Sequence, residues 1–216
     1  MLFVCIELAS LSSYILVAFH KESAAGGEAG MKYFIVGSVA SAIGIYGMSL
    51  LYLWNGDLSF DGLATSWAAT DGIDPLAGIG VGLMLVAFGF KVGAAPFHLA
   101  APDAYSGASS PVAGLLATAS KAMGFVAIIR VLIGITLPVE GEAFWFVTIA
   151  LISVITMTWG NLAALTSDNP KRILAYSSVA HAGYMLAGLA AIGSGIASLA
   201  ATKLILIAII FHLAVL

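Results

Sequence analysis

The sequence has little charge. Only 9% of its 216 residues are Asp, Glu, Lys or Arg, whereas 61% are hydrophobic, and the mean hydropathy is +1.07. Soluble domains carry about 25% charged residues. Eight basic and eleven acidic side chains could not cover a water-soluble globule of this length. We therefore expect lipid to be the solvent around most of the chain.

Cysteine is also scarce, and this shortage excludes several kinds of chemistry. The single thiol, Cys5, cannot form an intramolecular disulfide, a zinc site or an iron–sulfur cluster. A net charge of −3 does not favour nucleic acid as a partner. The sequence also lacks a nucleophile–base motif and a phosphate-binding loop. It therefore favours the movement of an ion over the making or breaking of covalent bonds, and we predict no cofactor or metal in this chain.

Long apolar runs are abundant. Runs of about 19–27 residues match the length that a helix needs to cross a hydrocarbon core of ~30 Å. We therefore predict an all-α, polytopic membrane protein in which residues 1–216 form one transmembrane domain with about seven spans. The predicted spans are roughly 1–19, 31–54, 76–98, 109–135, 143–166, 173–193 and 198–216.

The charges between the spans predict an orientation. Positive charges follow the first and fifth spans, at Lys21, Lys32, Lys171 and Arg172. Only acidic charges follow the second and fourth, at Asp57, Asp61, Asp71, Asp74, Glu140 and Glu142. Because cytoplasmic loops are enriched in Lys and Arg, the first set is predicted to be cytoplasmic. The outermost spans have no flanking polar residues, which predicts a piece of a longer protein.

Three ionisable residues lie deep inside predicted spans. A charge at the bilayer centre costs about 2.5–3.5 kcal/mol on insertion scales. A rise of ~1.5 Å per residue puts Glu7, Lys91 and Lys121 near the middle of the bilayer. Burial disfavours the ammonium form of a lysine and a nearby carboxylate favours it, so such a row can pass protons along. The alternative is an ion pair that only holds helices together, which would explain one lysine but not the second.

Other residues support a relay. Pro96, one turn after Lys91, is predicted to break its helix, and broken backbone at membrane depth is tolerated where it is buried in protein or faces water. His181 titrates near neutral pH and is a possible relay, with Lys203 and His212 as further candidates. Glycines at four-residue spacing, Gly78 with Gly82 and Gly89 with Gly93, favour close helix packing.

The residues around these lysines resemble a known family. The motifs are Gly89–His98, Ala101–Tyr105, Ser110–Val112, Ala119–Lys121 and, most closely, Gly160–Tyr184. Together they are similar to the N subunit (subunit 2) of the proton-pumping NADH:quinone oxidoreductase, respiratory complex I, within the antiporter-like subunits. The runs Pro-Asp-Ala-Tyr and Ala-Ser-Lys favour the N type over the M, L and sodium/proton antiporter types.

The resemblance implies a function and its residues. It implies proton translocation coupled to quinone reduction in other subunits, with Glu7 and Lys91 as an ion pair and Lys121 as the next carrier. It implies that the chain is a subunit of an enzyme but holds no redox centre. NAD, flavin, iron–sulfur clusters and quinone are then expected in partner subunits, and the other membrane-arm subunits and the lipid bilayer are its partners. The expected location is the prokaryotic cell (inner) membrane.

Two alternatives remain open at this point. The first is a subunit of an Mrp-type sodium/proton antiporter or of a membrane hydrogenase, which share the broken helix and its lysine. The second is a purely structural membrane subunit whose buried charges only join helices.

Overall fold

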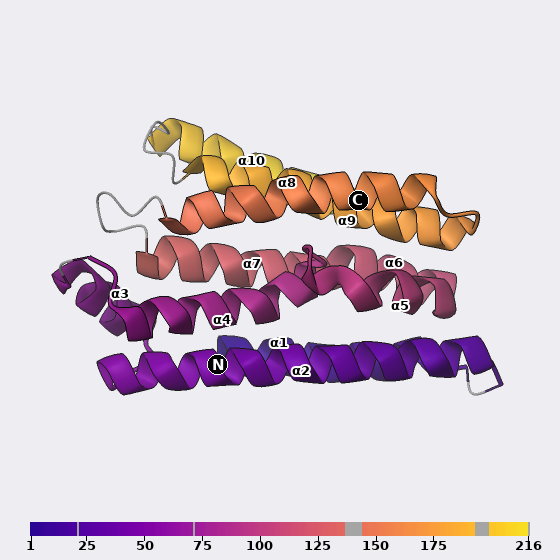
Figure 1. Cartoon of the computed structure of the whole chain (residues 1–216), viewed down its shortest axis with the longest axis horizontal. Coiled ribbons are helices and arrows are strands. Elements are labelled where there is room, and N and C mark those ends of the chain that lie inside the picture. The colour runs from indigo at the N-terminus through magenta and orange to yellow at the C-terminus, as the bar shows by residue number, and fades with distance from the viewer. Residues whose placement is uncertain (21, 71, 137–143, 193–198, 216) are drawn as a thin grey trace.

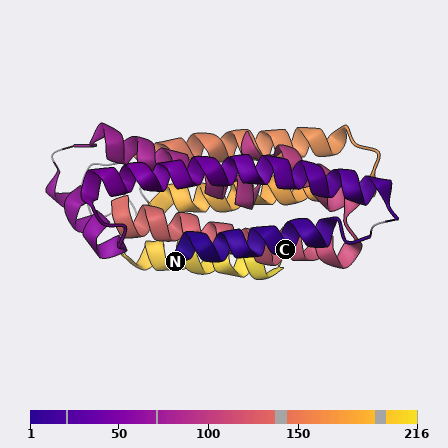
Figure 2. The ribbon, with the colours of Figure 1, turned by 90° about the horizontal axis from the view of Figure 1, so that it is seen from below.

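The computed structural model describes all residues except 21, 71, 137–143, 193–198 and 216. The described residues form helices that run roughly along one common axis (Figures 1 and 2). The α-helices are α1 (Leu2–Val17), α2 (Ala24–Asn55), α3 (Phe60–Ala69), α4 (Pro75–Val92), α5 (Ala101–Gly107), α6 (Ser110–Leu115), α7 (Lys121–Val131), α8 (Phe144–Leu165), α9 (Pro170–Ile192) and α10 (Leu199–Val215). Three short segments of other helix types are η1 (Phe97–Ala100), η2 (Leu116–Ser120) and η3 (Leu132–Thr136).

The prediction of an all-α polytopic membrane fold is confirmed. Within the described residues, five helical segments are long and apolar enough to cross a bilayer: Ala24–Asn55, Pro75–Gly107, Ser110–Thr136, Phe144–Leu165 and Pro170–Ile192. The first and last predicted spans correspond to two shorter apolar helices, Leu2–Val17 and Ala200–Val215. The boundaries differ most at the third span, which was predicted to end at residue 98 and instead continues to Gly107.

Local sequence signals set where the helices begin and end. The Ser23 hydroxyl accepts a hydrogen bond from the Gly26 amide at the start of α2. Asp74 accepts from two amides at the start of α4, and Pro75 follows at the first helical position, where it loses no hydrogen bond. Gly56 ends α2 with a positive φ of 75°, a conformation that glycine adopts without steric cost.

The connection between the second and third predicted spans contains a helix that was not predicted. In α3, Leu63 and Trp67 are buried against the bundle. The guanidinium of Arg130, near the end of α7, lies 5.1 Å from the centre of the Phe60 ring. With only ten residues and one apolar face, α3 is too short to give a span-like signal.

Glycines permit close helix contacts, and those with the backbone of another helix are at glycines outside the predicted pairs. A methyl group built on Gly47 of α2 would lie 2.7 Å from the Gly80 carbonyl oxygen of α4. One built on Gly160 of α8 would lie 2.7 Å from the Ala180 amide nitrogen of α9. A methyl group built on Gly78 would meet only the side chain of Ile73, and one built on Gly82 would lie 3.4 Å from the Trp145 ring of α8.

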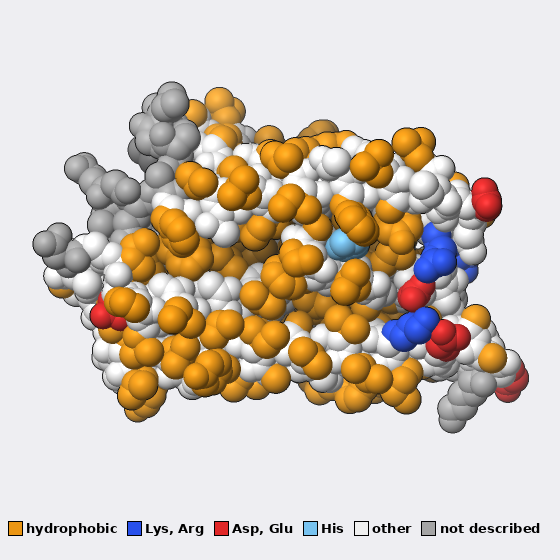
Figure 3. Space-filling model, in the orientation of Figure 1, with side chains coloured by type: hydrophobic (Ala, Val, Ile, Leu, Met, Phe, Trp, Pro, Cys, Tyr) orange, Lys and Arg blue, Asp and Glu red, His pale blue; other side chains and the backbone are white. Residues whose placement is uncertain are grey.

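The connections after the first, third and fifth predicted spans lie at one end of the bundle. The α1–α2, α5–α6 and α8–α9 connections lie together at the right of Figure 1. In Figure 3 most of the charged side chains gather at that end, whereas hydrophobic side chains cover the length of the bundle. Of the residues that set the predicted orientation, Lys21, Asp71, Glu140 and Glu142 lie outside the described residues. The cytoplasmic assignment of this end stays a prediction.

Candidate functional site

The third span is broken in the middle of the bundle. Helix α4 ends at Val92, and Gly93 follows with a positive φ of 76°. The Ala94 amide donates back to the Gly89 carbonyl at 2.8 Å, and the Ala95 amide donates to the Thr156 hydroxyl of α8 at 2.9 Å. Helical structure resumes at residue 97. The break predicted around Pro96 is present, and the helical residues Phe97–Gly107 beyond it place Lys91 deeper in the span than an end at residue 98 implied.

Lys91 lies at the last turn before the break and is 5% exposed. Its ammonium donates a hydrogen bond of 2.9 Å to the hydroxyl of Ser10, which is 2% exposed on α1. That hydroxyl in turn donates to the Ile6 carbonyl at 2.7 Å. A buried charge is tolerable only when polar groups replace its water, and here a serine on a neighbouring helix does so.

Glu7 lies one turn before Ser10 on α1 and is partly buried. Its carboxylate accepts a hydrogen bond of 2.8 Å from the Ser41 hydroxyl of α2. Glu7, Ser10, Ser41 and Lys91 line one cavity of about 10 Å³, counted as the volume open to a water's centre. Such a volume is close to what one water molecule requires. None of the ion pairs within 4 Å in the described part of the chain joins Glu7 to Lys91, so the pair implied by the resemblance is open here.

Lys121 is 1% exposed and lies directly after the π-helical turn Leu116–Ser120. Its ammonium donates to the carbonyl oxygen of Ser178 on α9 and, at 2.6 Å, to the hydroxyl of the same residue. A π-helical turn shifts the residues after it around the helix axis and is frequent at functional sites. No carboxylate of the described residues lies within ion-pair distance of the buried Lys121 ammonium.

The two buried lysines lie on facing surfaces of α4 and α7. A methyl group built on Gly124 of α7 would lie 3.2 Å from the Lys91 Cβ atom. One built on Gly93, at the break, would lie 3.9 Å from the Lys121 Nζ atom. The absence of side chains at both glycines lets each lysine lie against the neighbouring segment. The fold therefore brings Lys121 to the helix break beside Lys91, whose cavity Glu7 also lines.

A larger cavity of about 480 Å³ continues from the Lys121 site between α5, α6, α9 and α10. Its lining includes Ser178, His181 and His212, and Lys171 toward the charged end. The His181 Nδ1 and His212 Nε2 atoms are 3.0 Å apart. Two of the three possible relay residues are thus side by side. Lys203 is exposed on α10 and does not line this cavity.

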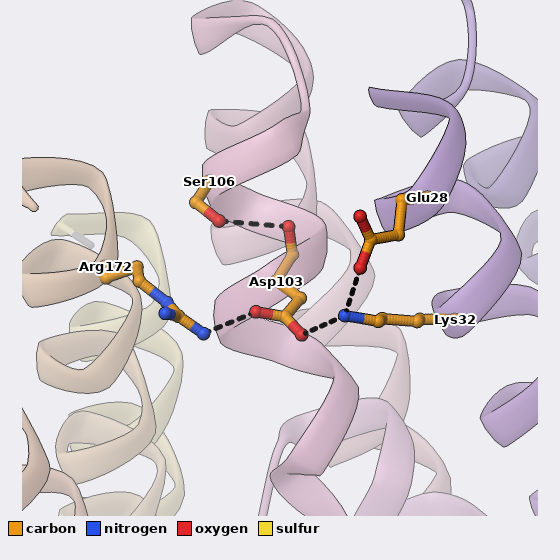
Figure 4. A network of polar contacts seen from close by, with 5 residues as sticks. All are labelled: Glu28, Lys32, Asp103, Ser106 and Arg172. Carbon is orange, nitrogen blue, oxygen red and sulfur yellow. Dashed lines mark hydrogen bonds and ion pairs between the residues drawn. The ribbon is translucent and has the colours of Figure 1, made fainter. Parts of the chain in front are cut away.

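A second group of charges lies at the end of the bundle (Figure 4). The Asp103 carboxylate of α5 accepts from Arg172 of α9 at 2.5 Å and from Lys32 of α2 at 3.4 Å. Lys32 also pairs with Glu28, one turn earlier, at 2.6 Å. These side chains are 29–67% exposed. The group joins three helices at the end of the broken span and is separate from the buried lysines.

Sequence reasoning missed the neutral partners of the site. Ser10, Ser41 and Ser178 bind the three charged groups, and Thr156 binds the backbone of the break. The run Ser10–Ser13 contains three serines, and only the helix register could have shown that Ser10 faces α4. For Ser178 the signal was its position three residues before His181, which puts both side chains on one face of α9.

This arrangement, a bundle of apolar helices with a broken span and two buried lysines, defines an antiporter-like membrane module. The sequence profile described as NADH:quinone oxidoreductase/Mrp antiporter, transmembrane, matches residues 1–216, and the chain belongs to this family. It is an integral, multi-pass membrane protein.

The relatives named here support the N type that the motifs favoured. The chain is 39% identical over 191 residues to NADH-quinone oxidoreductase subunit N 2 of Koribacter versatilis, covering 88% of this chain and 38% of that protein. A chain of respiratory complex I from Thermus thermophilus is 38% identical with a TM-score of 0.73, covering 89% of this chain and 40% of its own. A chain of the Mrp complex from Dietzia sp. is 27% identical with a TM-score of 0.80, over 98% and 39%. This chain spans about two fifths of the length of these relatives.

Proposed function

We propose that this chain is the proton-transferring part of a membrane-arm subunit of a proton-translocating NADH:quinone oxidoreductase. Glu7, Lys91 and Lys121 carry the proton, and His181 with His212 extends the path. Quinone reduction in other subunits drives the transfer. NAD, flavin, iron–sulfur clusters and quinone belong to those partner subunits, and other membrane-arm subunits cover this one.

The observation that carries the proposal is the burial of two lysines against neutral partners. Lys91 and Lys121 are 5% and 1% exposed, and each donates to a serine. An ion pair that served only to join helices would be closed, because breaking a buried pair costs 3–5 kcal/mol in typical cases. Here the carboxylate and both ammonium groups are each bound by a serine hydroxyl instead of by one another. Such an arrangement suits groups that gain and lose protons better than it suits a fixed brace.

The energies involved are of the right size. Two unit charges 4 Å apart at an effective dielectric constant of 20 attract by about 4 kcal/mol. Moving one charge across 100 mV takes about 2.3 kcal/mol. Closing or opening the Glu7–Lys91 pair therefore changes the free energy of protonated Lys91. The change is at least as large as the free energy needed to move one proton across the membrane.

The test uses the full-length subunit in its assembled complex, in membrane vesicles. Glu7→Gln and Lys91→Met should each sharply lower the number of protons taken up per NADH oxidised, because each removes a charged member of the path. Glu28→Gln and Lys32→Met remove an exposed carboxylate and an exposed ammonium and serve as controls. Unchanged proton uptake in Glu7→Gln and Lys91→Met would refute the proposal.

The similarity to the Mrp complex favours one second candidate, a subunit of a sodium/proton antiporter. The TM-score of 0.80 over 98% of this chain is the observation behind it. The same buried groups would then exchange protons against sodium without NADH. In vesicles that contain the full-length protein, a sodium gradient would drive proton movement and NADH would not.

A further inference from the structure

Within the proposed function, we propose that Ser10 is a positioning residue that holds Lys91 away from Glu7. The Ser10 hydroxyl competes with the Glu7 carboxylate for the Lys91 ammonium and so sets how often the pair is open. Ser41 does the same for Glu7 from the other side. The two serines make the pair a two-position switch instead of a permanent salt bridge.

Lys91 is bound by a Ser10 hydroxyl that can only accept from it. A lysine ammonium has three protons to donate and no acceptor of its own. Its partner among the described residues is the Ser10 oxygen, 2.9 Å away, and both side chains are buried. The proton of that hydroxyl is used in the bond to the Ile6 carbonyl at 2.7 Å. The Ser10 oxygen is therefore fixed with its lone pairs toward Lys91, ready to accept.

Glu7 is bound by Ser41 of α2 and shares a face of α1 with Ser10. Its carboxylate accepts from the Ser41 hydroxyl at 2.8 Å, so one of its oxygens is already bound on the side of α2. Glu7 and Ser10 are three residues apart and therefore lie on the same face of α1. The two acceptors that compete for the Lys91 ammonium therefore lie on one face of α1, about one turn apart.

A small cavity lies between the four groups. Glu7, Ser10, Ser41 and Lys91 all line it, and its size suits about one water molecule. It gives the ammonium room to move between its two acceptors. A tightly packed pair would have no such space. The structure thus holds the open position of the switch, with Lys91 bound to Ser10 and Glu7 bound to Ser41.

The test compares Ser10→Ala with Ser13→Ala in the full-length subunit of the assembled complex. Ser13 is 6% exposed on the same helix and donates to the Ala9 carbonyl at 2.7 Å, the same local bond that Ser10 makes to Ile6. Lys91 is not among the partners of Ser13 in the described part of the chain. A hydrogen bond to a charged group is stronger than one between neutral groups, so losing it shifts the balance between the open and the closed pair. Ser10→Ala should therefore lower the rate of proton uptake by roughly tenfold, and Ser13→Ala should not.

A double-mutant cycle separates the switch from a merely structural role. Without Glu7 there is no competitor, so Ser10→Ala should have little further effect in a Glu7→Gln background. Additive losses would show that Ser10 only stabilises the helix, and would overturn the inference. Ser10→Thr, which keeps the hydroxyl, should restore uptake. If Ser10→Ala does not assemble, Ser10→Cys keeps the volume with a weaker acceptor and should give an intermediate loss.

The outcome also distinguishes this inference from the proposed function. Normal uptake in Ser10→Ala together with a loss in Lys91→Met would overturn the role of Ser10 and leave the proton path intact. Normal uptake in Lys91→Met would remove the path itself.

Discussion

Two of the regions that hold charged groups differ in their exposure to water. At the end of the bundle, Asp103 joins Lys32 and Arg172 in a network whose side chains are 29% to half exposed. In the middle, Lys91 and Lys121 are almost fully buried and are bound by serines. Water can replace any partner lost from the first region, but not from the second. The comparison teaches that the opposite charges are paired where pairing contributes little, and kept apart where pairing would be strongest.

The largest effect is expected from Lys121→Met. This change removes the more buried lysine but keeps most of its apolar volume, so the helices can still pack. Positioned acid–base groups contribute about 10²–10⁴-fold to rates, so the rate of NADH-driven proton uptake should fall toward the lower end of that range, about a hundredfold. Vesicle measurements on the assembled complex would check it. A variant that pumps normally would show that the middle region is structural.

A smaller effect is expected from Thr156→Val, which changes the backbone support of the site. Valine has the shape of threonine without the hydroxyl, so the buried Ala95 amide loses its acceptor. An unsatisfied buried donor costs about 1–3 kcal/mol. The melting temperature of the purified subunit in detergent should drop accordingly. Thr158→Val is the matched control, because the exposed Thr158 hydroxyl donates to the Val154 carbonyl of its own helix. Equal drops in melting temperature for both variants would contradict the account.

The smallest effect is expected from Asp103→Asn at the end of the bundle. Exposed ion pairs contribute about 0–1 kcal/mol, and salt screens them. The loss of thermal stability should therefore be below about 1 kcal/mol and should shrink further in high salt. Glu28→Gln removes only the pair within α2 and serves as the control. A large, salt-independent loss would show that this network is as critical as the buried lysines.

The sequence predicted the fold well because membrane solvation constrains it strongly. A span must be long and apolar, and charges inside it stand out, so the helices, the broken span and the three buried charges could all be located. The helix boundaries and the short helix between spans were predicted less well. Helix α3 was missed because a short amphipathic helix looks like a polar connection. The third span was predicted to end too early, at residue 98, although helical structure resumes at Phe97 and continues to Gly107.

The partners in the site could not be predicted because they depend on which way each residue faces. Ser10 and Ser13 look alike in the sequence, yet only Ser10 contacts Lys91 among the described residues. The same ambiguity affected the glycines, where Gly80 and not Gly78 contacts α2. A low hydrophobic asymmetry is typical of helices with lipid on one side and protein on the other, so facing direction leaves little trace in a single sequence.

The central claim is that Lys91 and Lys121 exchange protons while buried, and the protonation state of their amines tests it most directly. Solid-state NMR of ¹⁵N-lysine in the full-length subunit, in its complex and in lipid, distinguishes an ammonium from a neutral amine. The two signals are assigned by their loss in Lys91→Met and Lys121→Met. The account predicts that both signals change between the two forms when NADH and quinone are supplied. Signals that remain those of an ammonium throughout turnover would contradict it.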